Sequence, residues 1–187
     1  FLVHFACYWG MVFLYDETPL SIASLNSLKN QVLCTLPLSF VVPTSVDTHW
    51  TQWFWGPFLC IVLSDVYFFC SHILLHKFMW NHHKTHHSGK VHVAKSLDAD
   101  LLEHLICNLG SFVFPFLFFT PGDAFVNFWS VASTINTCIS HVGHPILGDC
   151  GIHLLHHKHL KWNYGTGFYM MDRLFGTYRG VEQICTK

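Results

Sequence analysis

Histidine is the residue type whose number and spacing in this chain could do chemistry. The 187 residues include 16 histidines against 10 lysines and arginines together, and fourteen of the histidines fall between His72 and His159. Neutral imidazole is a good ligand for iron, zinc and copper. The clustering therefore predicts a metal site built from the part of the chain between these two positions.

Four short motifs contain ten of these histidines. They are an HxxxH pair, two HxxHH motifs and an HxxH pair between those two. Residues three or four apart are neighbours on one helix face, so we expect each motif to converge on one ion. The ten candidate ligands are His72, His76, His83, His86, His87, His141, His144, His153, His156 and His157.

The number of ligands favours two metal ions. Ten imidazoles exceed the four ligands of a tetrahedral zinc site and fit two ions with about four to six ligands each. Two redox-active irons can bind and cleave O2, giving an oxidant that attacks an unactivated C–H bond. An all-histidine site also avoids the carboxylates of soluble di-iron bundles, which are costly near a membrane interior.

Six histidines are left out of this set. We expect His4, His49, His92 and His104 to be hydrogen-bonded core or interface residues, the usual state of a buried polar group. His82 and His159 flank the motifs and are candidates for hydrogen-bond partners of the ligands.

The composition indicates an integral membrane protein. Hydrophobic residues make up 51% and charged residues 11% of the chain, whereas soluble proteins carry roughly 25% charged residues. The net charge of -1 and the absence of a Lys/Arg tract give no indication of a nucleic-acid partner. None of the eight cysteines forms a CxxC pair, so we expect reduced thiols and no disulfide framework.

Apolar segments predict an all-α chain, and a membrane span needs about 20 such residues. Residues 57–75 form the clearest long helix, and residues 101–119 and 124–139 predict a helical hairpin with its turn at residues 120–123. Residues 1–15 predict the end of an incomplete span, because the chain begins with Phe, and residues 32–46 a short or kinked segment. Three tryptophans predict an interfacial aromatic belt: Trp50, Trp53 and Trp55.

Basic residues predict the orientation of these segments. Four lysines follow the long helix between residues 77 and 95, and four further basic residues follow the hairpin between residues 158 and 179. By the positive-inside rule both regions are cytosolic. The histidine motifs are therefore expected at the cytosolic ends of the spans.

With their flanking residues, three of the motifs resemble the histidine boxes of the fatty acid hydroxylase/sterol desaturase superfamily. Residues 65–76 are similar to the first box, residues 80–88 to the second and residues 153–157 to the last. The tail at residues 163–165 and 172–178 is also similar to the family's ending. The resemblance covers about residues 55–180, and three boxes in order are far more specific than a single HxxHH motif.

The resemblance implies an endoplasmic-reticulum enzyme. It implies one domain over residues 1–187, with about four transmembrane helices under a cytosolic helical cap that holds a dinuclear metal site. Carried over by position, the eight histidines of the boxes would bind two iron ions, and His141 matches an additional ligand. His144 is included too, although fatty-acid hydroxylases have their second histidine four residues on and not three.

Further residues are expected to support the ligands. An acid inside an apolar helix is functional by default, so Asp65 is a candidate acceptor for a ligand; a helix-packing hydrogen bond is its alternative role. Asn163 and Tyr164 are expected to hydrogen-bond the ligands or their helix, and Asp172 could pair with Arg173.

The resemblance implies hydroxylation of a C–H bond in a sterol, fatty acid or sphingolipid. The oxidant would be O2, with NAD(P)H-derived electrons from a separate cytochrome b5 and its reductase. Five phenylalanines are candidates to shape a substrate tunnel, with a lipid-facing or core position as the commoner alternative: Phe68, Phe69, Phe112, Phe114 and Phe116. Desaturation at the same site is the alternative. A metal transporter would hold its ligands at mid-span, and a structural zinc protein would need only four.

Overall fold

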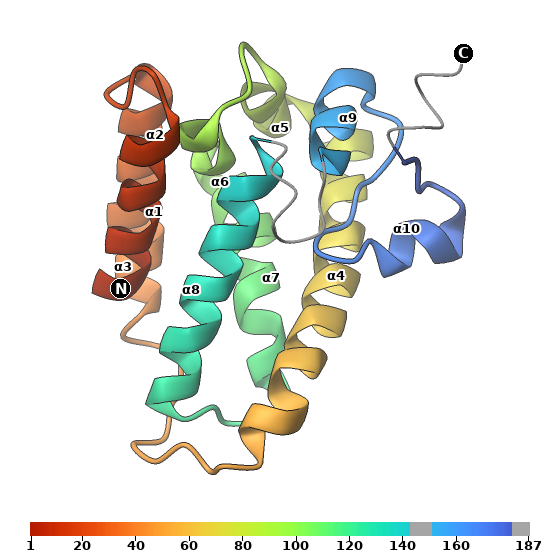
Figure 1. The fold of residues 1–187 in the computed structure, drawn as a ribbon. Coiled ribbons are helices and arrows are strands. Elements are labelled where there is room, and N and C mark those ends of the chain that lie inside the picture. The colour runs from red at the N-terminus through yellow and green to blue at the C-terminus, as the bar shows by residue number, and fades with distance from the viewer. Residues whose placement is uncertain (143–150, 181–187) are drawn as a thin grey trace.

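The structure is a computed structural model that describes residues 1–142 and 151–180. Within these residues it is helical, apart from one isolated bridge between Ser45 and Gly122 (Figure 1). The prediction of an all-helical chain is therefore confirmed for the described residues.

Helix α4 is the longest element and runs from Gln52 to Phe78. Its 27 residues span about 40 Å, and it is the one helix among the described residues that is long and apolar enough to cross a membrane. It begins five residues before the predicted start at Pro57, so Pro57 lies inside the helix and offers no amide hydrogen to the carbonyl of Trp53. Trp53 and Trp55 consequently lie in its first turns.

The predicted hairpin is present, but its first arm is irregular. That arm comprises α6 (Leu101–Glu103), the π-helical η3 (His104–Leu109), α7 (Gly110–Val113) and the 3-10 turn η4 (Phe114–Leu117). The second arm is α8 (Asp123–Ser140). Ser45 holds the turn between them, since its amide donates to the Pro121 carbonyl and its carbonyl accepts from the Asp123 amide, both at 2.9 Å.

The N-terminal helices lie against the second arm of the hairpin. Helix α1 (Leu2–Tyr15) packs along α8, whereas α4 packs against α7 and η4. Helix α2 (Ile22–Asn30) continues through the π-helical η1 (Gln31–Thr35) into α3 (Leu36–Leu38). Only residues 32–38 of the segment predicted as short or kinked at residues 32–46 are helical: they end a helix that begins at Ile22, and residues 39–46 are non-helical.

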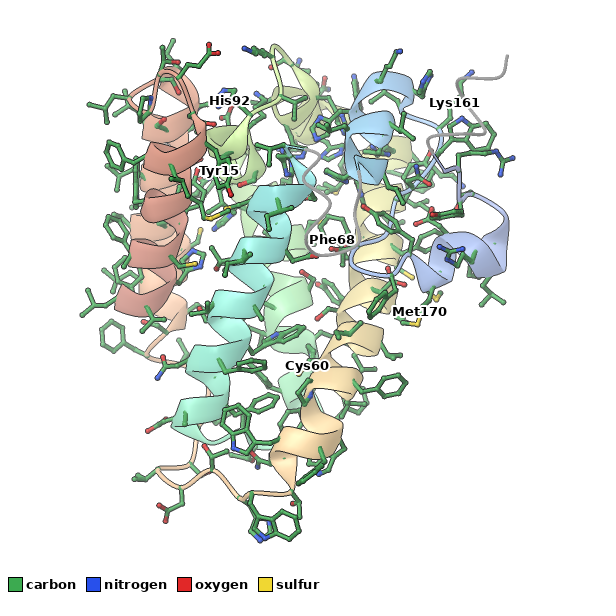
Figure 2. All side chains as sticks on the ribbon, viewed as in Figure 1. Tyr15, Cys60, Phe68, His92, Lys161 and Met170 are labelled. Atoms are coloured by element: carbon green, nitrogen blue, oxygen red, sulfur yellow. The ribbon has the colours of Figure 1, made fainter. Side chains whose placement is uncertain are left out.

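Short elements cover one end of this bundle. They are α5 (Trp80–His87), the 3-10 turn η2 (Val93–Leu97) and α9 (Ile152–His159), with α10 (Met170–Phe175) beside α4 (Figure 1). The Asp16 carboxylate joins α1 to η2, because it accepts the amide hydrogens of Val93 and Ala94 at 2.8 Å. His92, near α1 in Figure 2, donates to the same carboxylate at 2.9 Å.

The six cysteines among the described residues are free thiols. Cys60 lies in an apolar core with Phe116, Phe125 and Trp129. Cys138 lies in a second core with Tyr8 and Val12 of α1. The prediction of free thiols in place of a disulfide framework is confirmed for these six cysteines.

Candidate metal centre

Nine of the ten candidate ligands lie together in two groups beneath the short elements. The five-histidine group comprises His72, His76, His83, His87 and His156. The four-histidine group comprises His86, His141, His153 and His157. Within each group the candidate ligand atoms lie within 4.8 Å of one another. The tenth candidate, His144, lies outside the described residues.

The two groups divide the histidine motifs between them. Pairs spaced by four residues stay together, as His83 and His87 do on α5. His86, which is three residues from His83, points to the other group, although it is adjacent to His87. The expectation that spacings of three and four both converge on one ion is therefore wrong, because only the spacing of four keeps two side chains nearly aligned on a helix.

Backbone and carboxylate acceptors orient the five-histidine group. Nδ1 of His72 donates to the Tyr164 carbonyl at 2.7 Å, and Nδ1 of His156 donates to the Trp162 carbonyl at 2.7 Å. Nδ1 of His83 donates to the Glu103 carboxylate at 2.8 Å. A neutral imidazole carries one proton, so each Nε2 atom presents a lone pair.

These lone pairs face one another. The Nε2 atoms of His72 and His83 are 3.0 Å apart, and those of His83 and His87 are 2.8 Å apart. His72 and His83 have no proton to share, so their approach is repulsive unless a cation lies between them. Nitrogens about 2.1 Å from one ion lie about 3.0 Å apart at right angles and about 4.2 Å apart when opposite. The donor set therefore fits one metal ion.

The four-histidine group follows the same pattern. Nδ1 of His141 donates to the Thr137 carbonyl at 2.8 Å, which leaves its Nε2 lone pair 3.4 Å from Nε2 of His86 and 3.3 Å from Nε2 of His157. Nδ1 of His86 and of His157 is buried without a hydrogen-bond partner among the described residues. This second set of nitrogens fits a second ion.

Burial keeps these imidazoles neutral. It lowers the pKa of His83 from 6.5 to about 2 and the pKa of His156 to about 3, and the neighbouring imidazoles add to the shift. Both side chains are therefore unprotonated at pH 7, and the neutral form is the one that binds metals.

The C-terminal tail supports the five-histidine group through backbone groups. The Asp172 carboxylate accepts the amide hydrogens of Tyr164 at 2.8 Å and of Gly165 at 2.6 Å, which holds the Tyr164 carbonyl against His72. A Cβ on Gly165 would lie 2.8 Å from Oδ2 of Asp172 and closer still to Asp65, so this position needs glycine. The expected pairing of Asp172 with Arg173 is wrong, because Arg173 stacks on Tyr178.

The other two predicted support residues also act on the tail. The Asp65 carboxylate of α4 accepts the amide hydrogens of Thr166 and Met171, both at 2.9 Å. Asn163 donates to the Ile152 carbonyl at the start of α9 at 3.2 Å and accepts from the Arg179 amide at 2.7 Å. Neither side chain hydrogen-bonds a histidine ligand; both join the tail to helices that carry ligands.

Glu103 is a partner that the sequence reasoning missed. Its carboxylate is 3% exposed and is the acceptor for His83. The argument applied to Asp65, that an acid in an apolar segment is functional, would have found it. Of the flanking histidines, His82 pairs with Asp100 at 3.1 Å on the surface and not with a ligand.

A cavity of about 940 Å³ opens beside the four-histidine group. Its walls include His86, His141 and His153, together with residues of α1, α4, α7 and α8. Phe68, which Figure 2 shows between α4 and α8, and Phe112 line it. The other expected tunnel residues, Phe69, Phe114 and Phe116, are not among the lining residues; Phe69, for example, stacks on Phe175.

Comparison with known proteins identifies the family. The family model described as fatty acid hydroxylase matches residues 57–177, which contain both histidine groups. The chain belongs to this family, within the fatty acid hydroxylase/sterol desaturase superfamily that its motifs resemble.

Curated relatives are sterol enzymes by name. The chain is 30% identical to a putative methylsterol monooxygenase of Dictyostelium discoideum over 63% of its length. It is 30% identical to a Delta(7)-sterol 5(6)-desaturase of Schizosaccharomyces pombe over 93% of its length, and 29% identical to one of Gibberella zeae over 72%. The chain spans 48%, 51% and 40% of these relatives respectively. No solved structure matches it significantly.

Proposed function

We propose that the chain is the core of a membrane-bound di-iron oxygenase that uses O2 and reducing equivalents to oxidise a C–H bond of a sterol. The observation that carries the proposal is the pair of histidine groups, whose Nε2 lone pairs converge at 2.8 to 3.4 Å. Family membership and the names of the relatives support oxidation of a lipid. Bound iron would supply the activation of O2 that such a reaction needs.

Each part of the chain has a role in this proposal. The five-histidine group and the four-histidine group would each hold one iron, with His144 as a further ligand. Asp65, Asn163, Asp172 and Tyr164 would keep the ligands in position through the tail. The cavity would bind the lipid with a C–H bond next to the four-histidine group and exclude water from it.

A membrane location agrees with the surface of the bundle. Helix α4 is longer than the roughly 30 Å hydrocarbon core of a bilayer, and large apolar side chains such as Phe54, Phe58 and Leu117 are exposed. We propose about four membrane-embedded segments: α1, α4, the 101–117 arm and α8. The histidines lie at one end of α4, which is unlike a transporter with ligands at mid-span, and nine converging imidazoles exceed a structural zinc site.

The positive-inside rule assigns the histidine end to the cytosol. A cytosolic site would receive electrons from NAD(P)H through a separate cytochrome b5 and its reductase, and the endoplasmic reticulum is the proposed location. Hydroxylation is the first proposed outcome. Desaturation is the second, and it is supported by the relatives named as sterol desaturases.

The test is iron analysis and turnover of the purified chain in lipid vesicles. The assay contains cytochrome b5, its reductase, NADH, O2 and a Δ7-sterol or a methylsterol, and mass spectrometry follows the products. We expect two irons per chain and a product that has gained an oxygen atom, or has lost two hydrogens if the chain is a desaturase. A protein with neither bound iron nor turnover, when a related desaturase works in parallel, contradicts the proposal.

A further inference from the structure

The cavity reaches only one of the two histidine groups. His86, His141 and His153 of the four-histidine group line it, and no member of the five-histidine group does. A lipid in the cavity therefore lies against the four-histidine group alone. An oxygenase also takes up electrons from a protein donor, and the side chains that join the five-histidine group to the surface indicate where this donor binds.

Among the described residues, three aromatic rings other than histidines contact ligands of the five-histidine group. Phe68 lies 5.0 Å from His72 between ring centroids, but it lines the cavity. Tyr164 lies 5.8 Å from His72, and its half-buried ring is held by its hydroxyl, which donates to the Leu160 carbonyl at 3.0 Å. The third ring belongs to Trp80, which is 38% exposed. Of the three, only Trp80 opens to the surface.

Trp80 contacts three ligands at once. Its ring is stacked on that of His87, with 5.7 Å between the centroids and 23° between the planes. The same ring lies 5.4 Å from His76 and 6.1 Å from His83. Trp80 also begins α5, the helix that carries His83 and His87, so its backbone is fixed relative to these ligands. The indole therefore joins the five-histidine group to the surface through direct ring contacts.

Two lysines flank Trp80. Lys77 precedes it by three residues in the last turn of α4, and Lys84 follows it by four residues, on the same side of α5. Both side chains are exposed, and neither amino group pairs with a carboxylate of the described residues; Lys84 contacts the Asn81 side chain at 3.4 Å. A hollow of about 400 Å³ lies where α4 meets α5 and is lined by residues 77–82. The exposed indole is thus part of a hollow with a basic rim.

The rest of this end of the bundle carries the same charge. Residues 66–97 contain four lysines and no aspartate or glutamate, and residues 151–171 contain two lysines and likewise no acid. Lys161 of the second segment lies at the histidine end of the bundle (Figure 2). Asp100, which contacts α5, is paired with His82 at 3.1 Å. Charge complementarity therefore favours an acidic protein on this surface.

We propose that an acidic electron-transfer protein docks over Trp80, between Lys77 and Lys84, and that Trp80 conducts its electron to the five-histidine group. One electron leaves the donor's haem, which is oxidised, and reduces the ion that this group holds; no bond forms or breaks. Lys77, Trp80 and Lys84 do not line the cavity, so donor and lipid bind at different faces. The inference rests on the proposed function for its metal but concerns where the donor docks.

The first part of the test measures docking to the full chain in nanodiscs of phosphatidylcholine. The probes are the haem domain of cytochrome b5, which is acidic, and cytochrome c, a basic haem protein. We expect only cytochrome b5 to bind. Lys77→Glu and Lys84→Glu should each weaken this binding about fivefold at low salt, as the loss of an exposed ion pair does. The difference should disappear at about 1 M salt, which screens surface charges.

Lys29→Glu is the matched control, because Lys29 is exposed on α2, which contacts η1 and η2. It should bind cytochrome b5 as the unmodified chain does. If Lys77→Glu and Lys84→Glu also bind it unchanged, the inference is overturned, because these lysines then face lipid headgroups. Equal binding of both haem proteins overturns it as well.

The second part measures reduction of the iron-loaded chain by stopped flow, with reduced cytochrome b5 or with dithionite, which needs no docking. We expect Trp80→Leu to lose most of the rate with cytochrome b5 and none with dithionite, and Trp80→Phe, which keeps a ring, to recover part of it. Trp50→Leu is the control, since Trp50 is exposed near the other end of α4.

Two results of the second part overturn the path through Trp80. An unchanged rate in Trp80→Leu means that the electron enters elsewhere. Equal slowing with both reductants means that the substitution disturbs the metal group itself. Docking is measured without reference to iron, so a chain that binds cytochrome b5 through Lys77 and Lys84 but holds no iron contradicts the proposed function alone.

Discussion

The two histidine groups are built from the same motifs but supported differently. In the five-histidine group, Glu103 and two backbone carbonyls hold three of the rings by their Nδ1 protons. In the four-histidine group the Thr137 carbonyl holds His141, while Nδ1 of His86 and of His157 has no partner among the described residues, as is also true of Nδ1 of His87 in the five-histidine group. Three members of the four-histidine group line the cavity, and no member of the five-histidine group does.

The five-histidine group is therefore held by the surrounding protein, whereas the four-histidine group faces the cavity. Hydrogen bonds from the other ring nitrogen determine the tautomer and the direction of a ligand. Among the described residues, three such bonds hold rings of the group that lies away from the cavity. We therefore expect the five-histidine group to hold its metal more tightly and the four-histidine group to be more sensitive to the occupant of the cavity.

The largest expected effect comes from two adjacent residues. His86→Ala and His87→Ala should each reduce turnover by at least about a thousandfold, because each removes a ligand of a reaction that needs both metals. Each should also lose about half of the bound iron, measured by mass spectrometry of the metal. The double variant should lose nearly all of it, since the two side chains belong to different groups.

His82→Ala is the matched control for this pair. His82 lies on the same helix but pairs with Asp100 at the surface, so iron and turnover should be unchanged. If the double variant retained as much iron as either single variant, the division into two groups would be wrong.

Glu103→Gln should weaken metal binding in the five-histidine group alone. A neutral amide holds the His83 ring less firmly, and loss of such a partner weakens metal affinity by about 10- to 100-fold. Competition with a chelator measures this change, and one of the two irons should leave first. Asp100→Asn is the control, because that carboxylate contacts His82 and no ligand. Equal release of both irons would show that Glu103 does not distinguish the groups.

Asp172→Asn should lower the stability of the tail by about 2 to 4 kcal/mol. The buried carboxylate accepts from two amides and from the Thr177 hydroxyl, and an asparagine cannot accept all three bonds. Thermal unfolding in detergent measures the loss, and exposed Asp47→Asn should leave the unfolding temperature unchanged. An unaltered unfolding temperature in Asp172→Asn would mean that the tail does not support His72.

The smallest expected effect is that of pH on the metal-free chain. Burial lowers the pKa of His83 to about 2 and that of His156 to about 3, from 6.5. Below pH 6.5 the unfolded chain takes up protons that the folded chain does not, so stability falls as the pH decreases. At pH 5.5 each group contributes a loss of about 1.4 kcal/mol. His83→Gln should remove one such share from the pH dependence of unfolding, and an unchanged pH dependence would contradict it.

Much of the fold could be predicted because apolar segments and turns carry local signals. The helix predicted at residues 124–139 is α8 (Asp123–Ser140), and the 120–123 turn is present. The predictions failed where packing overrides the local pattern. Pro57 does not begin α4, and the first residues of the apolar stretch at residues 32–46, up to Leu38, continue a helix that starts at Ile22.

The candidate ligands could be predicted from the sequence, because histidines three and four residues apart form a local pattern. Nine of the ten candidates lie in the two groups. Their division between two groups was not evident. Side chains three residues apart are offset by about 60° around a helix, and the position of neighbouring helices decides which group each one faces. For this reason His86 lies in a different group from His83 and His87, and His156 lies in a different group from His153 and His157.

The sequence by itself determined the kind of chemistry: a helical, apolar chain whose imidazoles can bind metals and whose boxes identify the family. The tertiary structure decided which ring nitrogens meet, which carbonyls orient them and which of them face the cavity. These features join residues far apart in the chain, such as His72 and Tyr164 or Thr35 and His104. Their contacts depend on how whole helices pack, and no local sequence pattern encodes that packing.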